Sequence, residues 1–206
     1  MATTGKPLEI LFRDPPWAAR MLGSTRWAWL WLLPRLYVGY AWLDSGLGKL
    51  NNPAWTTGEP LRGFWQNAVA LPASPARPPI AFEWYRSFIQ SLLNAGSYTW
   101  FADLIMIGEL LVGLALILGA FTGLAAAGGA FMNWNFMMAG TASINPLLFL
   151  LSVFLILAWK NAGWIGIDRW LLPNLGTPWE PGALFERERR GTPATCAPRP
   201  RISPPR

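Results

Sequence analysis

An apolar run from Gly108 to Leu124 constrains this chain more than any other stretch, because it carries a single ionisable residue, Glu109. Helices of water-soluble proteins carry polar residues along one whole face, and this run does not. An ionisable group at bilayer depth costs about 2.5–3.5 kcal/mol on insertion scales, so it needs a partner. The run therefore predicts a membrane-spanning helix with an internal polar contact.

The composition of the whole chain agrees with a membrane location. Of the 206 residues, 52% are hydrophobic and only 14% are charged, whereas soluble domains carry about 25% charged residues. The 14 tryptophans gather near the ends of the apolar runs, as interfacial anchors do. The sequence predicts an all-α integral membrane protein built as one bundle.

Four apolar segments predict a four-helix transmembrane bundle. They cover residues 27–47, 100–121, 124–138 and 146–159. Short uncharged turns join the last three, whereas a long capping connection over residues 51–98 joins the first two. The predicted organisation is an interfacial arm over residues 1–25, a transmembrane domain over 26–173, and a Pro- and Arg-rich tail over 174–206.

Arg35 is the other isolated charge of the apolar segments. It lies nine residues after Arg26, about 13 Å along a helix. Snorkelling to the headgroups is one interpretation, but this depth favours a buried partner. Glu109 lies about 15 Å from the same end of the antiparallel second helix, so the depths match to within a turn. We predict an Arg35–Glu109 pair, with Asn133 or Asn135 completing its network.

The long connection is rich in proline and contains aromatic residues, which argue against disorder. Residues 61–70 and 80–94 are each predicted to form a short amphipathic helix. The simpler interpretation is a pair of interfacial helices that cap the bundle. The alternative is a substrate-binding cap in which Arg62 or Arg86 faces an anion.

The chain has no histidine and one cysteine, Cys196, which limits its chemistry. Bis-histidine haem, the usual histidine metal sites and cysteine-held iron–sulfur clusters are excluded within it, so no metal site is expected. No Gly-rich phosphate loop and no Ser–His or Cys–His nucleophile is present, which argues against hydrolase chemistry. A redox role needs an organic cofactor such as a quinone, or a partner that carries the metal.

Much of the net charge of +6 lies in the C-terminal tail. A basic tail beside a membrane more often meets anionic lipid or fixes topology than binds nucleic acid, and no nucleic-acid motif is present. Most lysines and arginines flank the first and last apolar segments. The positive-inside rule therefore predicts a multi-pass protein of a bacterial or archaeal cytoplasmic membrane with both termini cytoplasmic. The expected partners are the lipid bilayer and other membrane-complex subunits that contact the tails.

Three stretches, in this order and at this spacing, resemble the DoxX membrane protein family. They are Arg35-Leu-Tyr-Val-Gly-Tyr-Ala-Trp-Leu-Asp-Ser-Gly-Leu-Gly-Lys49-Leu50, the run from Gly108-Glu109 to Gly123, and residues 163–173. The family includes the DoxD-type membrane subunit of thiosulfate:quinone oxidoreductase. The resemblance implies a four-helix membrane bundle and, for some members, electron transfer to a membrane quinone.

Two functions follow, and the sequence leaves both open. In the first, the chain is the quinone-reducing subunit of a thiosulfate:quinone oxidoreductase-type enzyme, with Arg35 and Glu109 near the quinone head and Glu109 relaying a proton. In the second, it is a non-catalytic accessory subunit of a larger respiratory or photosynthetic membrane complex. In the first, Tyr37, Tyr40, Trp42, Asn133 and Trp134 are assigned to the quinone, and Arg62 and Arg86 to the substrate anion.

Overall fold

The computed structural model describes residues 14–176, and these residues form helices joined by turns, with no strand among them. The predicted all-α class is confirmed for this part of the chain. Within the described residues, residues 14–169 form one compact unit, and residues 170–176 belong to a second. Most of the predicted arm and nearly all of the predicted tail lie outside the described residues.

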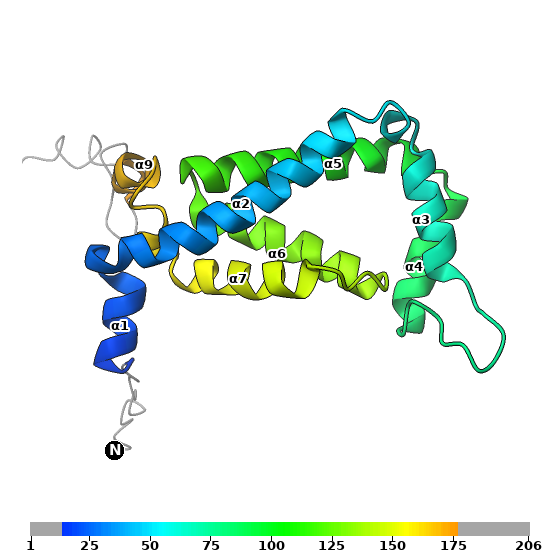
Figure 1. The fold of residues 1–206 in the computed structure, drawn as a ribbon, viewed down its shortest axis with the longest axis horizontal. Coiled ribbons are helices and arrows are strands. Elements are labelled where there is room, and N and C mark those ends of the chain that lie inside the picture. The colour runs from blue at the N-terminus through cyan, green and yellow to red at the C-terminus, as the bar shows by residue number, and fades with distance from the viewer. Residues whose placement is uncertain (1–13, 177–206) are drawn as a thin grey trace, which may run out of the picture. The chain divides into compact units, whose positions relative to one another are not determined.

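Four long helices lie within a few residues of the four predicted apolar segments. They are α2 (Ala28–Leu50), α5 (Tyr98–Leu118), α6 (Thr122–Met138) and α7 (Asn145–Leu157). α2 packs along α5, α5 packs on α6, and α6 packs on α7 (Figure 1). We call these four helices the helical core.

Within residues 14–176, α5 is the one helix that is both long and apolar enough to cross a membrane. α7 is apolar but shorter. α2 has 23 residues but includes Arg35, Asp44 and Lys49, and α6 has 17 residues, below the roughly 20 that a straight span needs. That all four helices span a membrane therefore stays a prediction.

Small residues let α2 and α5 approach each other closely. A Cβ atom at Gly113 of α5 would lie 2.5 Å from the backbone nitrogen of Leu43 and 2.9 Å from the carbonyl oxygen of Gly39. Contacts of this kind fix the relative register of two helices, because larger side chains cannot enter them. Gly46 of α2 likewise lies against Leu110 of α5, so the two helices run antiparallel.

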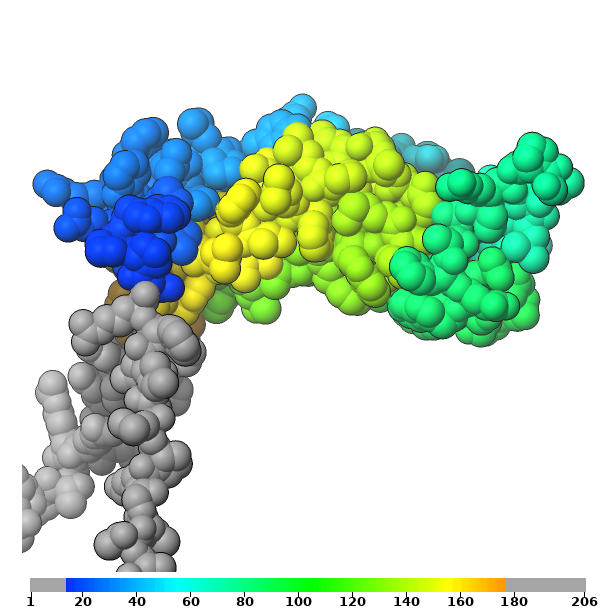
Figure 2. Space-filling model, turned by 90° about the horizontal axis from the view of Figure 1, so that it is seen from below, coloured from blue at the N-terminus to red at the C-terminus, as the bar shows by residue number. Residues whose placement is uncertain are grey.

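Three short helices cover one end of the helical core, and we call them the cap. They are the 3-10 helix η2 (Trp55–Thr57), α3 (Glu59–Val69) and α4 (Glu83–Asn94) (Figures 1 and 2). The two amphipathic helices predicted at residues 61–70 and 80–94 are thereby confirmed. The Tyr85 hydroxyl donates to the backbone and side-chain oxygens of Asn135, each at 3.1 Å. The Trp55 indole donates to the Ala102 carbonyl at 2.8 Å.

The other end of the helical core is closed by α1 (Pro16–Gly23), the 3-10 helix η1 (Thr25–Trp27) and α8 (Trp159–Ala162), and α9 covers Asp168–Leu175. The Asn161 side chain donates to the carbonyls of Met21 and Ser24 at 3.1 and 3.0 Å. The Trp31 indole also donates to Met21, at 2.9 Å. These bonds attach the segment before α2 to α8 and to the first turn of α2.

Candidate functional site

An ion pair lies where the helical core meets the cap. Lys49 Nζ is 2.7 Å from Glu109 Oε2, and the side chains are 18% and 1% exposed. Nζ also donates to Ser45 Oγ at 2.8 Å, one turn earlier on α2. The ammonium lies 5.0 Å from the ring centroid of Trp55, which comes from the cap. Both helices and the cap therefore hold the position of this charge.

The predicted Arg35–Glu109 pair is wrong. The antiparallel register that places Gly46 beside Leu110 also brings Lys49 to Glu109. Arg35 precedes Lys49 by two heptads on α2, which separates them by about 21 Å. The prediction compared the distance of Arg35 from the start of α2 with the distance of Glu109 from the end of α5. These two helix ends do not lie at the same level, because α2 extends past the end of α5. Arg35 is level with the turn that follows α5.

Arg35 is buried at that turn, where it binds backbone carbonyls. Nη1 donates to Ala162 at 3.0 Å and Nη2 to Ile165 at 2.7 Å. Gly119 ends α5 with a φ of +66°, and a Cβ atom there would lie 2.5 Å from Nη1. Glycine is therefore favoured at this position by both its backbone conformation and the space available.

Asp168 stabilises the same region from a neighbouring position. Its carboxylate accepts hydrogen bonds from the backbone N–H groups of Phe121 and Thr122, at 2.7 and 2.9 Å. These groups belong to the start of α6, where a negative charge is favourable. Arg35 and Asp168 thus join the α5–α6 turn to the segment after α7, which is a structural role.

The ion pair lines a pocket of about 390 Å³ between the helical core and the cap, which we call the Lys49 pocket. Ser45, Lys49 and Glu109 form one polar part of its wall, and aromatic and aliphatic groups form most of the rest. The lining residues are Ala41, Trp42, Ser45, Lys49, Trp55, Pro60, Leu61, Phe64, Ile105, Glu109, Phe136, Thr141, Ser143, Ile144, Asn145 and Leu148. This combination is typical of small-molecule sites.

A second cavity of about 390 Å³, the apolar slot, shares a wall with the Lys49 pocket. Leu61, Phe64, Ile105 and Phe136 line both cavities. Its other lining residues are Trp65, Tyr85, Phe88, Ile89, Leu92, Phe101, Leu104, Gly108, Val112, Gly128, Phe131, Met132, Asn135 and Ala139. Among these, Leu104 and Phe131 are exposed, so the slot reaches the outer surface of α5 and α6.

The residues predicted to bind a quinone do not form one group. Trp42 lines the Lys49 pocket together with Glu109. Tyr37 and Tyr40 are exposed on the outer side of α2, and Trp134 is partly exposed on α6. Asn133 is fully buried and lines neither cavity.

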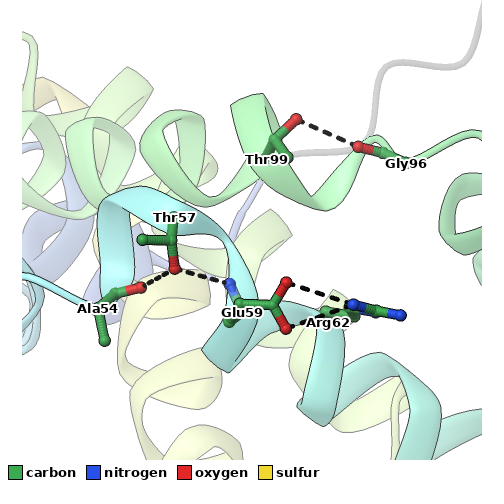
Figure 3. A network of polar contacts seen from close by, with 6 residues as sticks. All are labelled: Ala54, Thr57, Glu59, Arg62, Gly96 and Thr99. Carbon is green, nitrogen blue, oxygen red and sulfur yellow. Dashed lines mark hydrogen bonds and ion pairs between the residues drawn. The ribbon is translucent and has the colours of Figure 1, made fainter.

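The two arginines predicted to bind an anion lie in the cap, away from the Lys49 pocket lining. Arg62 is 3.3 Å from Glu59, one turn earlier on α3 (Figure 3). Arg62 also lies over the Tyr98 ring. Arg86 is 3.6 Å from Glu83 on α4. Each arginine is therefore already paired with a carboxylate, and the anion assignment stays a prediction.

The sequence analysis missed Lys49, Ser45 and Trp55 as site residues. Lys49 appears in it only as a member of the first stretch that resembles the DoxX family. A signal was present in the spacing: Arg35, Trp42 and Lys49 recur every seven residues and so share one face of α2. A lysine on the same face as two buried residues is a candidate for burial itself.

No group of three or more His, Cys, Asp or Glu residues that could hold a metal ion occurs within residues 14–176. The chain thus presents a helical core, a cap, and a buried ion pair at their junction, with one clearly membrane-compatible helix.

The model of the DoxX family matches residues 30–141, more than half of the chain, and the chain belongs to the DoxX family. The predicted family is confirmed, whereas the match does not distinguish the DoxD type. The matched range includes both Lys49 and Glu109. No curated protein and no solved structure matches the chain. The family is membrane-associated, in agreement with the apolar character of α5.

Proposed function

We propose that this chain binds a quinone in the Lys49 pocket and serves as the quinone-reducing membrane subunit of a thiosulfate:quinone oxidoreductase-type system. The observation that carries the proposal is the buried Lys49–Glu109 pair on the wall of an aromatic pocket that adjoins the apolar slot. The proposal includes the multi-pass topology with cytoplasmic termini. Electrons would come from a partner subunit that oxidises the sulfur anion.

The residues of the pocket fit such a ligand. A quinone needs aromatic surface for its ring, polar groups at its carbonyl oxygens and apolar space for its tail. Trp42 and Phe136 supply aromatic surface. The apolar slot, across the wall formed by Ile105 and Phe136, offers space for a tail.

Lys49 is the residue best placed to bind a carbonyl oxygen. An ammonium group has three donors, and Lys49 directs two of them at Glu109 and Ser45. The third donor remains for a ligand in the pocket. Trp55 covers the ammonium from the cap side and limits the access of water.

A bound quinone supplies a two-electron acceptor that also takes up two protons. Glu109 and Lys49 can hold protons at Oε2 and Nζ, 2.7 Å apart, which is within direct transfer distance. Because Glu109 is almost completely buried, the pair rather than bulk water sets the local proton supply. Arg35, at the opposite end of the helical core, has no part in this chemistry.

The test is to purify the full chain with its partner subunits in mild detergent, extract bound quinone for mass spectrometry, and measure thiosulfate-dependent reduction of a soluble quinone analogue. We expect quinone to co-purify with the wild type, and Lys49→Met to lose most of it. Glu109→Gln should retain binding better than it retains reduction. Glu83→Gln, a change of an exposed carboxylate on α4, is the matched control and should behave as the wild type.

The accessory-subunit function is the competing outcome of the same experiment. If no quinone co-purifies and no reduction occurs with the partner subunits present, the pocket is not a quinone site. The Lys49–Glu109 pair would then be a structural contact between the helical core and the cap.

A further inference from the structure

Three buried side chains in the middle of the helical core present polar atoms without hydrogen-bond partners. They are Trp42 through Nε1, Asn133 through both atoms of its amide, and Ser152 through Oγ. None of these atoms bonds to any other group within residues 14–176, and the side chains are 3%, 0% and 0% exposed. A buried polar group without a hydrogen-bond partner destabilises the folded state. A cluster of them therefore points to a ligand that forms hydrogen bonds.

Trp42 and Asn133 lie at neighbouring levels on facing helices. A Cβ atom at Gly129 of α6 would lie 2.8 Å from Trp42 Nε1, so the indole nitrogen is directed at this point of α6. Asn133 follows Gly129 by four residues and therefore lies one turn farther along the same face. The lack of a side chain at Gly129 leaves the indole nitrogen uncovered by any larger group there.

Ser152 reaches the same level from α7. α6 and α7 are antiparallel, and Gly123 at the start of α6 lies against Trp159 after the end of α7. Counting back along α7 from that contact places Ser152 about level with Ala130 of α6. Ala130, like Ser152, is buried.

The cluster lies one helical turn beneath the Lys49 pocket. Trp42 itself lines the pocket, together with Phe136 and Leu148. Phe136 is three residues after Asn133, and Leu148 is four residues before Ser152. On the far side, a layer of fully buried apolar groups, Leu116, Ala126 and Leu155, belongs to the same core cluster as Trp42.

We propose that Trp42, Asn133 and Ser152 bind ordered water inside the helical core, next to the Lys49 pocket. The indole only donates, whereas the amide and the hydroxyl both donate and accept, so one or two water molecules can satisfy all of them. Buried water typically makes about three hydrogen bonds, which this set provides. The apolar layer on the far side bounds this water, so the water does not conduct protons across the helical core.

The role of this water is to deliver protons to the Lys49–Glu109 pair, and that role rests on the proposed function. The hydration itself does not depend on it. The experiments below therefore measure hydration directly and need neither quinone nor activity.

The first experiment uses the sign of a stability change in the full chain. If water satisfies the cluster, Ser152→Ala and Asn133→Leu remove hydrogen bonds, and each should lower the folding equilibrium constant about tenfold in detergent. Ser87→Ala, at an exposed position of α4, corrects for the higher helix propensity of alanine. A constant that is unchanged or increased relative to this control would show a dry cluster and overturn the proposal.

The second experiment measures access of a water-sized oxidant. In a Cys196→Ser background, Ser152→Cys is compared with Leu155→Cys, because Ser152 and Leu155 are both fully buried on α7. Hydrogen peroxide is added to the folded protein, and sulfenic acid is trapped and quantified after unfolding. We expect oxidation at position 152 to be at least tenfold faster. Equal rates at the two positions would overturn the proposal, whatever the quinone assay shows.

Discussion

Breaking the Lys49–Glu109 pair should reveal a coupling that is specific to these two residues. At 2.7 Å, two unit charges attract each other by about 6 kcal/mol at an effective dielectric constant of 20, and desolvation offsets much of this attraction. Lys49→Met leaves a carboxylate that is 1% exposed and should cost about 3 kcal/mol of unfolding free energy. Glu109→Gln should cost less, about 2 kcal/mol, because the Lys49 ammonium keeps its bond to Ser45.

The double variant, Lys49→Met with Glu109→Gln, should lose about 3 kcal/mol of unfolding free energy. The two single losses exceed this by about 2 kcal/mol, which is the coupling free energy of the pair. The assay is reversible unfolding in mixed micelles, followed by tryptophan fluorescence, of the wild type, both single variants and the double variant. Arg35→Met combined with Glu109→Gln is the control cycle, and its effects should add to within about 0.5 kcal/mol because the residues are far apart. A coupling below about 0.5 kcal/mol for Lys49 with Glu109, or above about 1 kcal/mol for Arg35 with Glu109, would refute the assigned pairing.

Three further changes test the packing around the site. Arg35→Met should lower the unfolding free energy by about 3 kcal/mol, because two carbonyls lose charge-assisted donors, and Arg35→Lys should recover less than half, since an ammonium lacks the planar fork. Burial raises the pKa of Tyr85. The stability that its neutral phenol supplies is therefore complete below about pH 10 and is lost above it. Thermal unfolding between about pH 9 and 11 should show this loss in the wild type and not in Tyr85→Phe. Gly113→Ala places a methyl group against the α2 backbone and should cost about 1–3 kcal/mol, whereas Gly48→Ala, with no atom within 4 Å, should stabilise by about 0.5–1 kcal/mol in the same unfolding assay.

The helices were predictable from the sequence because their signals are local. Each apolar run is bounded by charged residues or small turn residues, and the observed ends differ from the predicted ones by only a few positions. The two cap helices followed from helical spacing of their apolar residues for the same reason. Membrane insertion is not tested by these boundaries.

The ion pair was not predictable by counting depth, because helix register is a non-local property. It depends on which small residues meet, and here Gly39, Gly46 and Gly113 set the contact between α2 and α5. A shift of one turn changes the partner of Glu109 without any change in local sequence. The seven-residue spacing of Arg35, Trp42 and Lys49 identifies one face of α2, but it does not say which of the two cations meets the carboxylate.

The distribution of polar groups along the helical core determines where ligand chemistry can occur. Arg35 binds backbone carbonyls at the end of the helical core opposite the cap. The apolar layer around Leu116 and Leu155 separates Arg35 from the Lys49 pocket. The Lys49 pocket, at the cap end, is lined by an ion pair, so a ligand bound there meets two ionisable groups. On the proposed topology, the N-terminal end of α2 faces the cytoplasm, so the pocket and its cap lie toward the opposite face. A hydrophobic carrier would enter from the side through the apolar slot, whereas a water-soluble donor would have to pass its electrons at the cap. The partner subunit that oxidises the donor is thus expected to bind over α3 and α4.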